Sequence, residues 1–147
     1  MNISVDSADE YFLNILSSEL WFEQDAEKKQ AAILMAENKI KKLPFIGTKV
    51  ADNQIDMFPR LYNGKLINLP DDVVMAIFEE ALFLLKQENG LSSELPDGVQ
   101  SLSLGGASIS FKESKSHFKL CDNASLYLDG WLRKGFNIST EKFKEVY

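Results

Sequence analysis

The sequence predicts a mainly α-helical protein, built as a small helical bundle of about four helices with an extended β-hairpin and a C-terminal arm. In four segments the apolar residues recur with the 3.6-residue period of an amphipathic helix. These segments are 4–16, 26–42, 71–87 and 122–134. Over 99–111 apolar and small polar residues alternate around a Gly-Gly pair, which is typical of a hairpin. A chain of 147 residues is about one domain long, and we expect 1–134 to form it and 135–147 to be a docking tail.

The first two helices begin at residues that can cap them. Ser4 and Asp25 each precede an apolar-periodic segment, and their side-chain oxygens can accept hydrogen bonds from free N–H groups of the first turn. Pro44 ends the second helix, because proline has no N–H to donate. Between the two helices, Trp21 and Phe22 are expected to fold back onto the core as an aromatic plug.

The third helix has the broadest apolar surface in the chain. It follows a long connection, 45–69, which we expect to be functional or partly structured because loops of this length are uncommon. Since the apolar stripe is wider than one face needs, the helix is predicted to be central in the bundle or to pack on a second subunit. Its adjacent Glu79 and Glu80 diverge around the helix, which favours a solvated face over a catalytic pair.

Charge and cysteine content argue against several classes of protein. The chain has 16 Lys and Arg against 22 Asp and Glu, a net charge of −6. A protein that grips nucleic acid through its phosphates is expected to carry a basic surplus instead. The single cysteine, Cys121, excludes an intrachain disulfide and fits a reducing compartment. No apolar run approaches the roughly 18 residues of a membrane span, so we expect no membrane partner.

Few residues point to catalysis or to metal binding. The one histidine, His117, lies in a polar stretch, where such a side chain is usually solvated. One His and one Cys cannot supply the nitrogen and sulfur ligands of a zinc site. Gly105 and Gly106 lack the following helix of a phosphate-binding loop. We therefore expect a protein that is not an enzyme, with no catalytic residue, no cofactor and no metal.

Short motifs follow one another in order along the chain. They are Ser4-Val5, Ala8 to Phe12, Trp21, Ala31 to Ala36, Leu43 to Gly47, Phe58-Pro59-Arg60, Leu69-Pro70, Val73, Ala76, the stretch 99–111, and the closing Ala124, Leu128 and Leu132. In this order and spacing they resemble the head–tail connector, or adaptor, proteins of tailed phages, a family also labelled DnaT-like single-stranded-DNA-binding protein. The resemblance covers about residues 2–134, and the tail after Gly135 departs from it.

The resemblance implies a structural virion protein of the head–tail neck that is assembled in the host cytoplasm. Connectors are mostly helical subunits that form a ring, commonly a dodecamer, beneath the portal protein. The implied partners are the portal protein, neighbouring copies in the ring, a downstream neck, stopper or tail-terminator protein, and the genomic DNA that passes through without tight binding. An acidic channel fits this role, because it repels DNA phosphates.

Candidate interface residues lie in three places. Aromatic and arginine side chains are favoured binding hot spots, which singles out the motif around Pro59, although a turn that folds Phe58 onto its own core is an equal alternative. The apolar positions of the hairpin and of the tail complete the set, and the tail has the alternative of folding back on its own bundle. The set is Phe58, Pro59, Arg60, Leu102, Leu104, Ile109, Phe111, Phe136, Ile138, Phe143 and Tyr147.

Two other functions stay open beside the connector. One is a single-stranded-DNA-binding protein of replication, and the other is a helical interaction module of a host protein. Single-strand binding needs basic residues interleaved with exposed aromatic rings, whereas the rings here mostly fall on the inner faces of helices.

Overall fold

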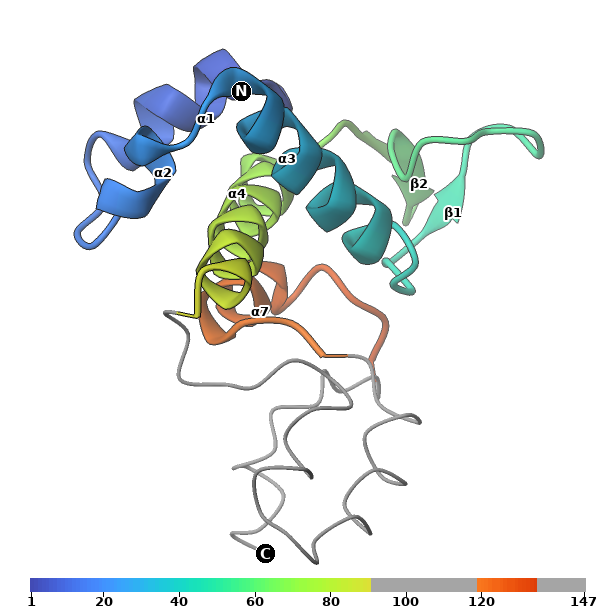
Figure 1. Cartoon of the computed structure of the whole chain (residues 1–147). Helices are drawn as coiled ribbons and strands as arrows, with labels where there is room; N and C mark the ends of the chain where they lie inside the picture. Colours follow the sequence, from blue (N-terminus) through green and yellow to red (C-terminus); the bar gives the residue numbers. More distant parts are fainter. Residues whose placement is uncertain (91–118, 135–147) are drawn as a thin grey trace, which may run out of the picture.

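The computed structural model describes residues 1–90 and 119–134, which form helices around one central helix and a small antiparallel sheet (Figure 1). The helices are α1 (Val5–Phe12), α2 (Glu19–Glu23), α3 (Ala26–Ile40), α4 (Asp71–Glu88) and α7 (Asp122–Leu128). The strands are β1 (Thr48–Lys49), β2 (Arg60–Tyr62) and β3 (Lys65–Ile67). The predicted fold class, mainly α with a β-hairpin, is confirmed. The hairpin predicted at 99–111 and the tail at 135–147 lie outside the described residues.

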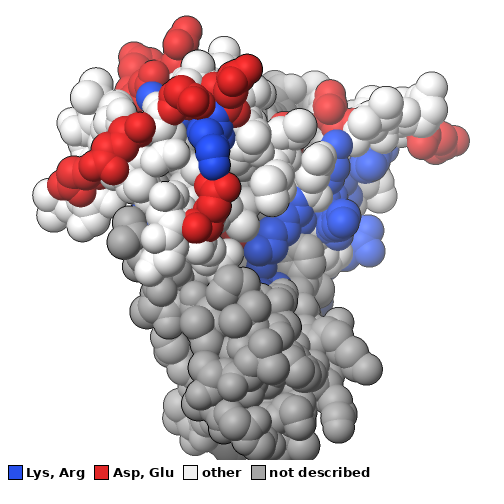
Figure 2. Space-filling model, in the orientation of Figure 1, with Lys and Arg blue, Asp and Glu red and all other residues white. Residues whose placement is uncertain are grey.

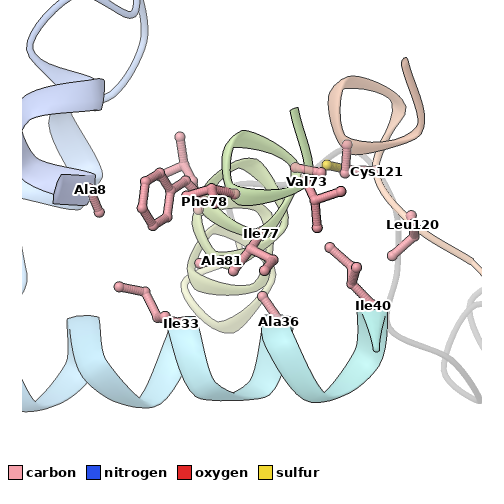
Figure 3. Packing of buried hydrophobic residues seen from close by; sticks show 14 of the residues in the cluster. Ala8, Ile33, Ala36, Ile40, Val73, Ile77, Phe78, Ala81, Leu120 and Cys121 are labelled. Atoms are coloured by element: carbon pink, nitrogen blue, oxygen red, sulfur yellow. The ribbon is translucent and has the colours of Figure 1, made fainter. Parts of the chain in front are cut away.

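The central helix is α4, and both α3 and α7 pack along it. Figure 3 shows Ile33, Ala36 and Ile40 of α3 pointing toward α4, where they meet Ile77 and Ala81. The small side chains at Ala36 and Ala81 are fully buried, and they let the two helices approach closely. Neighbours from the same chain thus cover most of the broad apolar stripe, so the prediction of a central helix is confirmed.

Helix starts are where local chemistry places them. The N–H of Ser7 donates to the Ser4 hydroxyl oxygen over 3.1 Å, and the N–H of Lys28 donates to the Asp25 carboxylate over 2.8 Å. Each bond satisfies a donor that the first turn of a helix leaves free. The predicted segments 26–42 and 71–87 agree with α3 and α4 to within two residues.

Two helix ends were predicted too late. The first helix stops at Phe12 rather than at 16. Beyond it the N–H groups of Asn14 and Ile15 donate to carbonyls three residues back, which tightens the chain into a turn, and Ser17 follows with a φ of 64°. The Ser18 hydroxyl donates to the carbonyls of Phe12 and Ile15. The last helix stops at Leu128 rather than at 134. Gly130, with a φ of 94°, follows this end, so Gly135 is not its stop.

The segment between the turn at Ser17 and α3 contains the aromatic pair Trp21 and Phe22. It folds as the short helix α2, which buries the Trp21 ring completely against the ring of Phe12, 4.8 Å between centroids. The predicted plug is thus confirmed for Trp21, whereas Phe22 is 43% exposed and is not part of it.

The predicted long connection contains the whole sheet. Its strands are antiparallel in the order β1-β2-β3, and the β2–β3 hairpin turns through Asn63 and Gly64, both with positive φ. This is the two-residue turn that matches the twist of paired strands. The expectation of a partly structured connection is confirmed.

Candidate functional site

The predicted interface motif, Phe58-Pro59-Arg60, leads into β2 and contains a cis peptide bond between Phe58 and Pro59. The ring of Phe58 is buried and meets the ring of Phe45 edge-on, 5.2 Å between centroids. Arg60 is also buried, and only Pro59 is exposed. The alternative in which the turn folds Phe58 onto its own core therefore describes the structure, and Phe58 and Arg60 are not available as hot spots on this folded body.

The buried Arg60 has a definite task within the fold. Its guanidinium donates to four backbone carbonyls, which belong to Ile46 at 2.8 Å, Gly47 at 3.0 Å, and Phe45 and Met57 at 3.3 Å. Burial, and next the nearby Arg133, lower the pKa of this guanidinium below its usual value. Arg60 thus fixes the chain between α3 and β1 against the sheet.

That same stretch holds the chain after α7. The N–H of Ile46 donates to the carbonyl of Trp131 over 2.9 Å, and the N–H of Arg133 donates to the carbonyl of Pro44 over 2.8 Å. The indole of Trp131 donates to Asp72, at the start of α4, over 3.0 Å. The connection after α3, the chain after α7 and the start of α4, which are distant in sequence, are therefore joined at this place.

The remaining predicted interface residues are not placed. The hairpin positions Leu102, Leu104, Ile109 and Phe111 and the tail positions Phe136, Ile138, Phe143 and Tyr147 lie outside the described residues, as do His117 and the Gly105-Gly106 turn.

Glu79 and Glu80 were predicted on a solvated face, and this is wrong. Both side chains are buried, and each binds across helices. Glu80 accepts from the Lys39 ammonium of α3 over 2.7 Å and from the N–H of Cys121, before α7, over 2.9 Å. Since a buried carboxylate without partners is costly, these bonds fix how α3 and α7 sit on α4.

Glu79 completes this polar network on the other side of α4. It accepts from the Tyr11 hydroxyl of α1 over 2.5 Å and from the Asn123 amide of α7 over 3.1 Å. The hydroxyl of Tyr127 lies 3.0 Å from that of Tyr11. We call Tyr11, Lys39, Glu79, Glu80 and the first turn of α7 the carboxylate network.

The Tyr11 hydroxyl and the Cys121 thiol, which lie beside these carboxylates, are not activated for chemistry. Burial, and next the bond to Glu79, raise the pKa of the Tyr11 hydroxyl far above its ordinary value. Burial, and next the charge of Glu80, raise the pKa of the Cys121 thiol as well. Because the thiolate is the reactive form of cysteine, Cys121 is an inert, protonated side chain here.

A sequence signal for the carboxylate network did exist. Between Val73 and Leu85 of α4 the only charged residues are Glu79 and Glu80. A helix that is apolar almost all round is buried, so carboxylates in its middle must be buried and paired. The partners Tyr11, Lys39 and Asn123 come from three other helices, and no local pattern points to them.

Charge on the surface is unevenly distributed. Figure 2 shows carboxylates gathered over α1, α2 and the start of α3, and basic side chains gathered around the end of α3 and the sheet. A separate apolar groove of about 360 Å³ runs between α3 and α4, lined by Ala31, Ala32, Met35, Leu84 and Leu85. Within residues 1–90 and 119–134, no three His, Cys, Asp or Glu side chains gather as around a metal ion, and no helix is long and apolar enough to cross a membrane.

A comparison of the chain with models of protein families, with curated proteins and with solved structures finds no match.

Proposed function

We propose that this chain is a head–tail connector, a structural protein and not an enzyme. Its copies form a ring under the portal protein of a tailed phage, extend the DNA channel and join the capsid to the neck or tail. The observation that carries the proposal is the ordered set of motifs over about residues 2–134 that resembles these proteins. In the assembled virion the protein lies in the neck, and its partners are the portal protein, further copies of itself and the next neck protein.

The internal bonds of the buried polar side chains support a structural role for this protein. Each buried carboxylate of α4 accepts hydrogen bonds from side chains or backbone of other helices, and the Arg60 guanidinium donates its hydrogen bonds to backbone carbonyls. These groups stabilise one arrangement of the body instead of facing a substrate. A protein that acts by assembly needs such a fixed body, because its partners recognise shape and surface charge.

A second candidate, single-stranded-DNA binding, is favoured by one observation. Lys41 and Lys42 follow α3, Lys49 and Lys65 lie on β1 and β3, and Tyr62 of β2, which pairs in register with Lys65, is 42% exposed. A basic surface with an exposed ring is the minimum that stacking on single strands requires. The net charge of −6 and the presence of a single exposed ring there make this the weaker candidate.

Two measurements on the same sample separate these functions. We expect the full chain to co-sediment with the purified portal protein of its phage. We also expect its affinity for a single-stranded oligonucleotide to be weaker than micromolar at physiological salt. A salt-dependent complex at sub-micromolar concentration that the Lys41→Glu, Lys42→Glu variant loses, without co-sedimentation with the portal, would overturn the connector in favour of DNA binding.

A further inference from the structure

Ion pairs divide the basic side chains of the described body into two groups. Three lysines of α3 each bind a carboxylate over 2.7 to 3.0 Å, and they are Lys28, Lys29 and Lys39. Four cations that come later in the chain are exposed and make no ion pair with the part of the chain that the structure describes. We call these four the basic face, and they are Lys42, Lys65, Arg133 and Lys134.

Three members of the basic face come together because the chain after α7 runs beside the chain after α3. The antiparallel bridge between Phe45 and Leu132 sets this alignment. In an antiparallel pair one segment advances while the other goes back, so residues 133 and 134 lie toward 44 and 43. Arg133 and Lys134 are thus brought to the place where Lys42 follows α3.

Lys65 joins this set from the sheet. It pairs in register with Tyr62, two residues after Arg60 on β2, and alternate residues of a strand share one face. The guanidinium of Arg60 reaches from this face to the carbonyls of 45–47, where the charge of Arg133 acts on it and helps to lower its pKa. The basic face therefore adjoins a buried fifth cation that binds only neutral carbonyls.

Two further lysines at this end of the body have acidic side chains close by. Lys41 lines a hollow of about 170 Å³ together with Glu37 and Asp56. Lys49 donates to the backbone of the loop that carries the exposed Asp52. Both lysines therefore lie outside the basic face, and the positive charge that is left without a carboxylate belongs to its four members and to Arg60.

We propose that the basic face is the part of the body that meets the portal protein, and that it binds a carboxylate-rich surface there. Arg133 can hold a carboxylate through two parallel N–H bonds, and complementary charge speeds the encounter of a subunit with its partner. Protein carboxylates fit this face better than nucleic-acid phosphates do, because the net charge of −6 repels a polyanion at long range and Tyr62 alone adds an exposed ring here among the described residues. The inference rests on the proposed function and names the surface that the portal contacts.

Charge reversal in the full chain tests the contact. Lys42→Glu and Lys134→Glu, made separately, should each weaken binding to the purified portal protein about fivefold at low salt. The difference from the native chain should shrink at high salt, because ions screen exposed charges. Lys28→Glu is the matched control, since it changes the net charge equally at the other end of α3, and it should leave the affinity within about twofold. Circular dichroism checks that each variant is folded.

The possible outcomes separate the inference from the proposed function. Equal portal affinity of the native chain and both variants overturns the inference and leaves the connector function in place, whereas a native chain that does not co-sediment with the portal removes both. If the variants instead lose affinity for a single-stranded oligonucleotide, or lose association with further copies, and still bind the portal normally, nucleic acid or a second copy is the occupant and the inference is overturned.

Discussion

The carboxylate of Glu80 joins three helices of the body. One oxygen accepts from Lys39 of α3, and the other accepts from the N–H of Cys121 at the start of α7. Desolvating such a carboxylate costs free energy that its ion pair only partly offsets. The carboxylate network therefore fixes one arrangement of the helices and adds little net stability. Removal of one partner leaves the desolvation cost of the carboxylate without compensation.

Replacement of Lys39 by methionine tests how much stability is lost when the Glu80 carboxylate lacks its cation. Lys39→Met keeps the aliphatic stem but leaves the buried Glu80 carboxylate without its cation, so we expect a loss of about 2–3 kcal/mol in the free energy of unfolding. Lys28→Met is the matched control, because the Lys28–Glu88 pair is about half exposed and such pairs contribute about 1 kcal/mol or less. Urea titrations followed by circular dichroism measure both, and equal losses would contradict the account.

The buried hydroxyl and thiol predict a dependence of stability on pH. Unfolded Cys121 loses its proton near its ordinary pKa of 9.0 and unfolded Tyr11 near 10.0, whereas the raised pKa of each folded group keeps its proton bound. Above these values the folded state binds more protons, so the free energy of unfolding falls as the pH rises.

Urea midpoints between pH 7 and 10.5 measure this slope. We expect a decline that starts near pH 9, and we expect Tyr11→Phe to be flatter than the native chain at the upper end of the range. A native midpoint that stays level or rises above pH 9 would show that these two groups do not contribute.

At the scale of elements, the sequence predicts helix starts better than helix ends. The caps of α1 and α3 depend on side chains one to three residues away, so a local pattern contains them. The end of α1 depends on the backbone turn that begins after Leu13, and the end of α7 on the turn at Gly130, whereas the apolar pattern runs on past these ends to Leu16 and Leu132. The β2–β3 hairpin had a local signal too, the Asn63-Gly64 pair, yet its strands are too short to show alternation.

In the candidate site too, the sequence identifies single residues but not the distant residues that they contact. The sequence singles out Phe58 and Arg60 as unusual side chains, but their burial comes from Phe45 to Gly47, more than ten residues away. Likewise the partners of Glu79 and Glu80 come from α1, α3 and α7. Such contacts are tertiary, and a one-dimensional pattern does not contain them.

Gly47 tests how closely the sheet is built onto the body. Its φ is 79°, and a Cβ there would lie 2.3 Å from the carbonyl oxygen of Leu61. Gly64, with a φ of 77°, has no atom within 4 Å of that position and is the matched control. Both alanine variants carry the backbone strain of about 1–2 kcal/mol, but Gly47→Ala should cost about 2 kcal/mol more because backbone must shift. Thermal melts that rank the two variants equally would contradict this packing.

At the scale of the whole molecule, the described chain is one helical body with unlike ends. Its carboxylates gather over α1, α2 and the start of α3 and its basic side chains around the end of α3 and the sheet (Figure 2), while the polar groups of the core are bound within the fold. Such a fixed body suits a protein that acts by assembly, because its partners recognise shape and surface charge.

Electron microscopy of the portal protein with and without the full chain distinguishes a connector from a protein that does not bind the portal. We expect an added ring of density on the tail-facing side of the portal, with one copy of the chain for each repeat and the DNA channel left open. Images of the portal that stay unchanged at saturating concentrations of the folded chain would contradict the connector function.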